Sequence, residues 1–127
     1  MPIDYCIFCD PSVKEKFMIL ENELFHSRWD EHPVSDGHAL VVPNKHIISF
    51  FDLSDEKLIK MYDVILVTKK TVDEKYHPDA YNLGINEGMA AGRTVNHFHI
   101  HLIPRYKGDV ENPRGGVRNI IPGKGDY

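Results

Sequence analysis

The alternation of apolar and polar residues along the chain predicts several short strands and one long helix. Residues 17–20 and 24–29 are apolar runs on either side of a Glu-Asn-Glu stretch, a pattern that is typical of a hairpin. A third apolar run, residues 38–42, follows a turn-forming Pro-Val-Ser-Asp-Gly segment and ends at a proline. Two further strands are predicted at residues 81–85 and 96–106, which gives about five strands in all.

Residues 54–76 carry apolar side chains at helical spacing and predict the single long helix. Ser54 is a suitable N-cap, and the acids Asp55 and Glu56 follow it in the first turn, where the helix dipole favours negative charge. The side chains expected to face the sheet are Leu58, Met61, Tyr62, Ile65 and Val72. Strands on both sides of one helix predict an α+β fold.

The composition fits one globular domain over residues 1–127, with a polar C-terminal tail at residues 111–127. With 42% hydrophobic residues, the chain is too apolar for wholesale disorder. Its net charge of −4 argues against nucleic-acid or membrane-surface partners, and no apolar run reaches the ~20 residues of a membrane span. The first ten residues do not resemble a secretory signal, and two cysteines are too few for a disulfide scaffold, so we expect a reduced, cytoplasmic protein.

Histidine is the unusual component, because the chain has eight histidines and three of them alternate at His97, His99 and His101. On a strand these three imidazoles would share one face, and the apolar residues between and after them would face the core. Two kinds of chemistry fit this pattern. A His-x-His pair can hold a catalytic zinc with a third ligand elsewhere. Alternatively, one imidazole is a nucleophile or general base that its neighbours orient. Spacing alone does not separate the two.

The sequence around these histidines resembles the histidine triad (HIT) superfamily of nucleotide hydrolases and transferases. The resemblance extends over about residues 3–110, the expected core of the domain. It is carried by CIFC at 6–9, D-x-x-P-x-x-x-G-H at 30–38, LVVPNKH at 40–46, NEG at 86–88 and AGRTVNHFHIHLIPR at 91–105. It implies a HIT-like fold, in which an antiparallel sheet of about five strands packs on one long helix and the chain forms a homodimer.

The resemblance also implies that a nucleotide α-phosphate is cleaved through a covalent nucleotidyl-histidine. By position, His99 resembles the nucleophile, and His101 resembles the residue that contacts the phosphate and assists the leaving group. His38 resembles a fourth histidine that orients the triad. The chemistry is reasonable, because a neutral imidazole is a good nucleophile when an acceptor holds its other nitrogen.

Four residues are predicted to bind the substrate. Asp30 lies where the family holds a ribose hydroxyl, although it could simply cap the turn that follows it. Asn86, Arg93 and Thr94 match the phosphate-contacting segment. Most relatives have Gln in place of Arg93, whose charged fork suits phosphate oxygens, so we hypothesise that it favours a polyphosphate chain unless it is merely solvated. Arg105 and the residues after it are closer to the dinucleoside polyphosphate hydrolases.

The resemblance further assigns a structural zinc to Cys6, Cys9, His46 and His97. A C-x-x-C pair alone could also be a redox pair or two packed thiols. A closed Cys₂His₂ site has no open position for water, so its zinc would stabilise the fold and would not take part in catalysis.

A purine nucleotide is the expected partner, with diadenosine polyphosphates as the first substrate and a nucleoside phosphoramidate as the alternative. Mg²⁺ could neutralise a polyphosphate chain. Two rival functions are a nucleotide-binding or interaction protein with weak residual activity and a metal hydrolase that uses His97 and His99. Ile7, Phe8 and Trp29 could line an adenine pocket or belong to the core.

Overall fold

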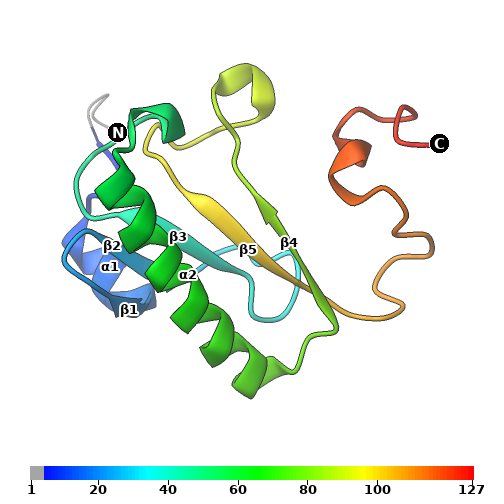
Figure 1. The fold of residues 1–127 in the computed structure, drawn as a ribbon, viewed down its shortest axis with the longest axis horizontal. Coiled ribbons are helices and arrows are strands. Elements are labelled where there is room, and N and C mark those ends of the chain that lie inside the picture. Colours follow the sequence, from blue (N-terminus) through cyan, green and yellow to red (C-terminus); the bar gives the residue numbers. More distant parts are fainter. Residues whose placement is uncertain (1–4) are drawn as a thin grey trace.

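Figure 1 shows an antiparallel sheet with one long helix across one of its faces, in a computed structural model that describes residues 5–127. The strands are β1 (Met18–Glu21), β2 (Phe25–Trp29), β3 (Ala39–Pro43), β4 (Ala80–Gly84) and β5 (Ile100–Arg105). They lie in the order β1-β2-β3-β5-β4, and every neighbouring pair is antiparallel. The predicted α+β class, with five strands against one helix, is therefore confirmed. The predicted starts of the domain and its core, residues 1 and 3, lie outside the described residues.

The hairpin of β1 and β2 is turned by Asn22, whose side-chain oxygen accepts hydrogen bonds from the backbone N–H groups of Leu24 and Phe25 at 3.0 and 2.9 Å. A short helix that the pattern did not predict, α1 (Pro11–Phe17), precedes this hairpin. Asp10 caps it by accepting from the N–H of Ser12, and a proline occupies its first turn. No side chain of α1 is buried, so it has no apolar periodicity to reveal it.

The long helix α2 (Asp55–Tyr76) begins at Ser54, as predicted, because the Ser54 hydroxyl accepts from the N–H of Lys57. It ends at His77, which adopts a left-handed conformation (φ 54°). Its buried stripe includes Met61, Val64, Ile65 and Val72, which pack on the sheet with Phe25, Val41 and Phe98 at the centre of the core.

One predicted core contact on α2 is wrong. Tyr62 is 58% exposed, because it lies about 100° around the helix from Met61 and so falls outside the stripe of positions 58, 61, 65, 68 and 72. Thr68 occupies that stripe instead. It is fully buried, and its hydroxyl donates to the hydroxyl of Ser27 on β2 at 2.7 Å.

The predicted histidine strand is shorter than expected, because β5 begins only at Ile100. Continuing the ladder with β3 to residue 98 would require an N–H from Pro43, and proline has none. The N–H of Phe98 instead donates to the carbonyl of Ile47. Phe98 is still buried in the core, so the alternation of apolar side chains persists although His97 and His99 precede the strand.

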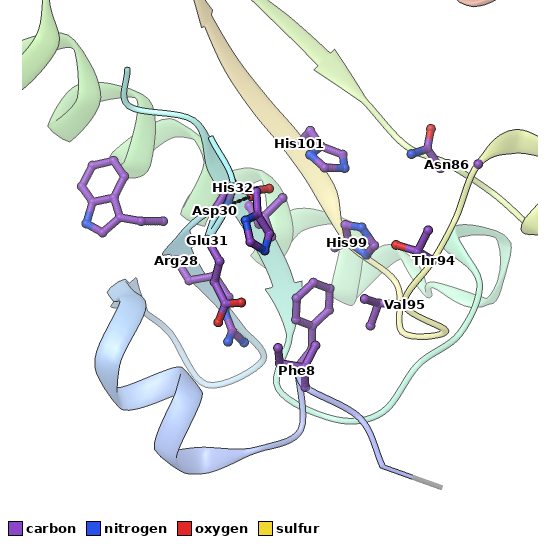
Figure 2. Close-up of a pocket in the computed structure, with 14 residues that line it drawn as sticks. Phe8, Arg28, Asp30, Glu31, His32, Asn86, Thr94, Val95, His99 and His101 are labelled. Atoms are coloured by element: carbon purple, nitrogen blue, oxygen red, sulfur yellow. Dashed lines mark hydrogen bonds between the residues drawn. The ribbon is translucent and has the colours of Figure 1, made fainter. Parts of the chain in front are cut away.

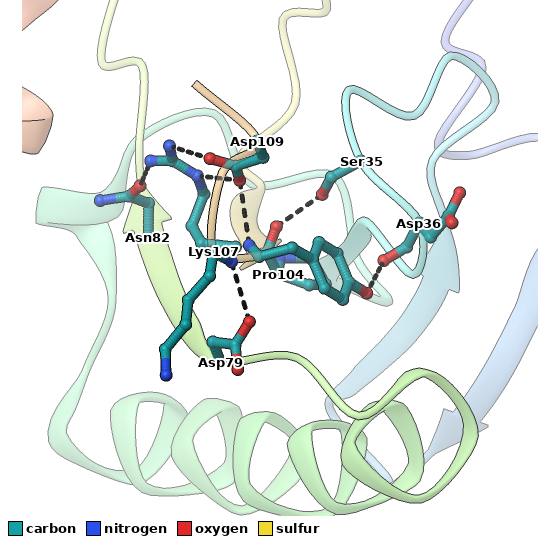
Figure 3. A network of polar contacts seen from close by, with 9 residues as sticks. Ser35, Asp36, Asp79, Asn82, Pro104, Lys107 and Asp109 are labelled. Carbon is teal, nitrogen blue, oxygen red and sulfur yellow. Dashed lines mark hydrogen bonds and ion pairs between the residues drawn. The ribbon is translucent and has the colours of Figure 1, made fainter. Parts of the chain in front are cut away.

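The end of β5 is fixed by a polar network (Figure 3). The guanidinium of Arg105 donates to both carboxylate oxygens of Asp109, at 2.8 and 2.9 Å, and to the side-chain oxygen of Asn82 on β4 at 2.6 Å. The backbone N–H of Lys107 donates to Asp79 at 2.8 Å. Arg105 therefore has a structural role at the edge of the sheet.

Three 3₁₀ turns complete the described elements: Phe50–Asp52, Met89–Ala91 and Gly116–Ile120. The last of them belongs to the C-terminal tail and contacts β4, and Figure 1 shows the tail beyond that strand. The tail is mostly exposed, as its polar sequence predicts. Among residues 5–127, no helix is long and apolar enough to cross a membrane.

Candidate functional site

A cavity of about 370 Å³ lies on the face of the sheet opposite α2 (Figure 2). Leu40 of β3 lines it, whereas the next residue, Val41, lies in the core beneath the helix. Four parts of the chain supply the rest of the wall: the N-terminal segment with Ile7 and Phe8, residues 28–32, the loop between β4 and β5, and the start of β5 with His101. The volume falls within the usual range of small-molecule sites.

His99 lines this cavity with one nitrogen already engaged. Its Nδ1 lies 2.8 Å from the backbone carbonyl oxygen of His97, which can only accept a hydrogen bond. Nδ1 therefore carries the proton, and Nε2 keeps its lone pair. Burial lowers the pKa of His99, which is 8% exposed, and so favours the neutral ring. This is the protonation state that a nucleophilic imidazole requires.

His101 has the opposite arrangement. The N–H of Val34 donates to Nδ1 of His38, so the proton of a neutral His38 sits on Nε2. That Nε2 lies 2.9 Å from Nδ1 of His101, which must then accept, and the proton of His101 is left on its own Nε2. Burial lowers the pKa of both rings and keeps them neutral. The cavity therefore contains one imidazole acceptor and one imidazole donor, with ring centroids 5.2 Å apart.

Asp30 lies at the start of the turn after β2 and lines the cavity. One carboxylate oxygen accepts from the N–H of His32 at 2.7 Å, which is the turn-capping role. The other oxygen lies 3.5 Å from Nε2 of His38. Asp30, His38 and His101 also offer possible metal-ligand atoms within 4.8 Å of one another. The hydrogen bond between the two imidazoles, however, already uses the facing nitrogens of His38 and His101. The contact of Asp30 with ribose stays a prediction.

The loop before β5 brings Asn86, Gly92 and Thr94 to the cavity wall, as the sequence predicted for phosphate-contacting residues. Gly92 has φ 99°, in the left-handed region that favours glycine. The contact of these side chains with phosphate stays a prediction.

Arg93 is the one predicted substrate-binding residue that does not line the cavity. Its guanidinium donates to the carbonyl of Ile48 at 2.7 Å and lies 3.4 Å from the carboxylate of Glu87. The other oxygen of Glu87 accepts from the N–H of Phe50 at 2.8 Å. Arg93 therefore links the loop to the segment that precedes α2, and a direct phosphate contact by this side chain stays a prediction.

The residues predicted to bind zinc come together beside this cavity. The ligand atoms of Cys6, Cys9, His46 and His97 all lie within 4.8 Å of one another. The Cys9 Sγ–His46 Nδ1 and His46 Nδ1–His97 Nδ1 distances are 3.2 Å, and both sulfurs lie 3.4 Å from Nδ1 of His97. The edges of a tetrahedron around zinc measure about 3.3–3.8 Å for such bond lengths, so the four side chains fit this ion.

The protonation of His97 also suits a metal. Its Nε2 lies 3.0 Å from the carbonyl of Pro43 and must donate to it, which leaves a lone pair on Nδ1 that points at the cluster. Burial lowers the pKa of His97 to about 4, which keeps the ring neutral. Without a cation, burial and Cys6 together raise the pKa of the Cys9 thiol to about 11, and a bound zinc would reverse this because it stabilises the thiolate.

Phe8, inside the C-x-x-C segment, connects the two groups of residues. Its ring centroid lies 5.8 Å from that of His97 and 4.8 Å from that of His99, and the Arg28 guanidinium carbon lies 5.0 Å from the same ring. The cluster of predicted zinc ligands therefore lies directly against one wall of the cavity.

Sequence reasoning missed Arg28 and Glu31, which also line the cavity. The alternation of side chains along β2 could have indicated Arg28, because it places His26, Arg28 and Asp30 on one face of the sheet. Ile7, Phe8 and Trp29 all line the cavity as suggested, and the ring of Trp29 also packs edge-on against Tyr76 at the end of α2.

Comparison with known proteins agrees with this geometry. An uncharacterised HIT-like protein of Methanocaldococcus jannaschii is 40% identical over 121 residues, covering 91% of this chain and 91% of the relative. The adenosine 5'-monophosphoramidase hnt1 of Schizosaccharomyces pombe is 37% identical and covers 79% of this chain and 74% of its own. An asymmetrical bis(5'-nucleosyl)-tetraphosphatase of the same yeast is 34% identical over 61% of this chain and 42% of its own.

Two solved structures share the fold. A HIT family protein of Bacillus anthracis superposes with a TM-score of 0.75 and 34% identity, over 84% of this chain and 77% of that one. A zinc-bound histidine triad family protein of Mycobacterium smegmatis gives a TM-score of 0.70 and 34% identity, over 82% of this chain and 77% of that one. The HIT domain family model matches residues 12–108, and on this match together with the shared fold the chain belongs to the HIT domain family.

Proposed function

We propose that this HIT family nucleotide hydrolase cleaves its substrate at the α-phosphate through a covalent nucleotidyl-His99 intermediate. The observation that carries the proposal is the opposite protonation of two neighbouring rings. His99 presents a bare Nε2 because the His97 carbonyl holds its Nδ1 proton, whereas His101 presents an N–H because His38 donates to its Nδ1. A nucleophile and an acid catalyst require this difference.

In the first step, Nε2 of His99 attacks the α-phosphorus, and the bond from phosphorus to the leaving group breaks. His101 donates its Nε2 proton to the departing oxygen or nitrogen, and the hydrogen bond from His38 holds its ring in place. In the second step, water attacks the phosphorus and gives a proton to Nε2 of His101, the P–N bond breaks and His99 is released as a neutral ring. The nucleoside monophosphate then leaves the cavity.

We propose a dinucleoside polyphosphate as the substrate, with diadenosine polyphosphates as the first choice and a purine nucleoside phosphoramidate as the alternative. The names of the two S. pombe relatives, a bis(5'-nucleosyl)-tetraphosphatase and an adenosine 5'-monophosphoramidase, support this pair of candidates. Asp30 would bind the ribose, and Asn86 and Thr94 would bind phosphate oxygens from the cavity wall. Mg²⁺ would accompany the polyphosphate as its counter-ion.

We also propose a structural zinc at Cys6, Cys9, His46 and His97, which the interatomic distances and the zinc-bound M. smegmatis relative support. Bound zinc would cross-link the N-terminal segment to the rest of the site, and the chemistry at phosphorus would remain with the other histidines. A homodimer is supported by a row of apolar side chains that are exposed on the outer face of α2, namely Ile59, Tyr62 and Leu66.

The decisive experiment compares the wild type with His99→Ala on diadenosine tetraphosphate and on adenosine phosphoramidate. We expect the wild type to hydrolyse at least one of them and to show, by intact mass, an adenylyl adduct after a rapid acid-free quench. The alanine variant should do neither. His77→Asn is the matched control, because this histidine lies at the end of α2 and asparagine tolerates its left-handed backbone. Equal turnover by His99→Ala would overturn the proposal.

A further inference from the structure

We infer that Arg28 selects the nucleobase, and that the base it selects is guanine in preference to adenine. The inference rests on the proposed function and revises its first choice of base, because the preferred dinucleoside polyphosphate would then contain guanine in place of adenine. It concerns a side chain that sequence comparison with the HIT family did not single out.

Arg28 lies on the cavity face of β2 and is 2% exposed. Its Nη1 has no hydrogen-bond partner among residues 5–127. The ring of Phe8 covers the guanidinium, with its centroid 5.0 Å from the guanidinium carbon. Glu31 also lines the cavity and acts on Arg28 electrostatically, but within the described chain no carboxylate lies at ion-pair distance from this guanidinium.

A buried guanidinium without an acceptor is unfavourable, because arginine stays charged and carries five N–H donors and no acceptor. The group that pairs with Arg28 must therefore bring hydrogen-bond acceptors into the cavity. Other side chains do not supply them to Nη1, so the ligand is the natural source.

The position along β2 indicates which part of a nucleotide reaches Arg28. Asp30, the predicted ribose contact, lies two residues further on and on the same face of the strand. His99 and His101, where the phosphate would react, lie across the cavity from β2 (Figure 2). A nucleotide places base, ribose and phosphate in this order, and so the base would lie at Arg28.

The acceptors of the four bases then determine the choice. Guanine presents two adjacent acceptors, O6 and N7, which match the fork of a guanidinium. Adenine presents N7 next to the N6 amino group, and that amino group would oppose a second arginine donor. Uracil offers no adjacent pair of acceptors, whereas cytosine offers O2 and N3. Of the two purines, which are the expected bases, only guanine fits the buried fork of Arg28.

The experiment measures the dissociation constants of GMP, IMP and AMP for the wild type by calorimetry. IMP keeps O6 and N7 but lacks the 2-amino group. We expect GMP and IMP to bind about tenfold or more tightly than AMP, as a bidentate arginine contact commonly gives. In Arg28→Met the three constants should converge. Arg114→Met, an exposed arginine outside the cavity, should leave the wild-type ratios unchanged.

Several outcomes would contradict the inference. AMP binding as tightly as GMP to the wild type overturns it even if Arg28→Met fails to fold, and Arg28→Gln provides a milder variant for the comparison. If IMP binds as weakly as AMP, the 2-amino group of guanine determines the selectivity, and the contact with Arg28 does not. If no nucleotide binds to the wild type, the proposed function itself fails. If all three bind equally, only the choice of base fails.

Discussion

Nε2 of His38 lies 2.9 Å from Nδ1 of His101, and one proton lies between these two nitrogens. Because Val34 already donates to the other nitrogen of His38, that proton belongs to His38, and the proton of His101 is left on its own Nε2. In the proposed mechanism, His38 would therefore be a positioning residue that acts through His101.

Replacing His38 with Phe should reduce catalysis in a way that depends on the leaving group. Without its donor, His101 can adopt the other tautomer and lose its acidic proton, so kcat should fall by roughly 10²-fold for a phosphoramidate that requires protonation. The loss should be much smaller for a nucleotide ester of 4-nitrophenol, which leaves without a proton. A variant that loses activity equally on both substrates would show that His38 has no role in proton delivery.

Replacing His26 should make the protein less sensitive to acid. Burial lowers the pKa of His26 from 6.5 to about 4, while its Nδ1 donates to the side chain of Asn44 at 2.9 Å. Below pH 6.5, His26 binds a proton in the unfolded chain but stays neutral in the folded chain. It therefore lowers the free energy of unfolding as the pH falls from 6.5 towards 4. At pH 5 the effect is about 2 kcal/mol.

The test is urea unfolding of the wild type and His26→Gln at pH 7.5 and pH 5. Between these two values the wild type should lose about 2 kcal/mol more unfolding free energy than the variant. A parallel decline in the two proteins would show that other groups cause the acid sensitivity.

Cys6→Ser should remove the metal and weaken nucleotide binding more than it slows the chemistry. Phe8 lies between the metal-binding cysteines and lines the cavity, so a loosened N-terminal segment should raise KM about tenfold and change kcat less. Elemental analysis should find one zinc per chain in wild type purified without chelator and much less in the variant. Wild-type protein without stoichiometric metal would contradict the assignment.

Arg93→Gln tests whether this arginine binds phosphate. A phosphate contact would require its guanidinium to leave the carbonyl of Ile48, and in that case kcat/KM for diadenosine tetraphosphate should fall about tenfold relative to adenosine phosphoramidate. The ratio of the two specificity constants is the measurement. An unchanged ratio together with a lower Tm would instead assign Arg93 to anchoring the loop.

The sequence predicted those parts of the molecule that rest on periodicity or on a motif. The strands, the long helix and its cap at Ser54 follow from local patterns, and the motifs placed Cys9 and His46 in one cluster although 37 positions separate them. Tyr62 was wrongly assigned to the core because the apolar character of a side chain does not show on which face of the helix it lies.

Other features depend on tertiary contacts that no local pattern records. The late start of β5 reflects the missing N–H of Pro43 on a neighbouring strand. The role of Arg93 as a link depends on the carbonyl of Ile48, which lies 45 positions away in the sequence. Arg28 was overlooked because a charged residue in a short strand is usually solvated, whereas here the ring of Phe8 covers its guanidinium.

His97 contributes to both groups of residues, but through different atoms. Its imidazole belongs to the cluster of proposed zinc ligands, whereas its backbone carbonyl accepts the proton of His99. Any amino acid supplies a carbonyl at this position. In evolutionary terms, the proposed zinc site and the tautomer of His99 are therefore separable: a descendant of this chain could lose the cysteines and replace His97, and His99 would keep its proton on Nδ1.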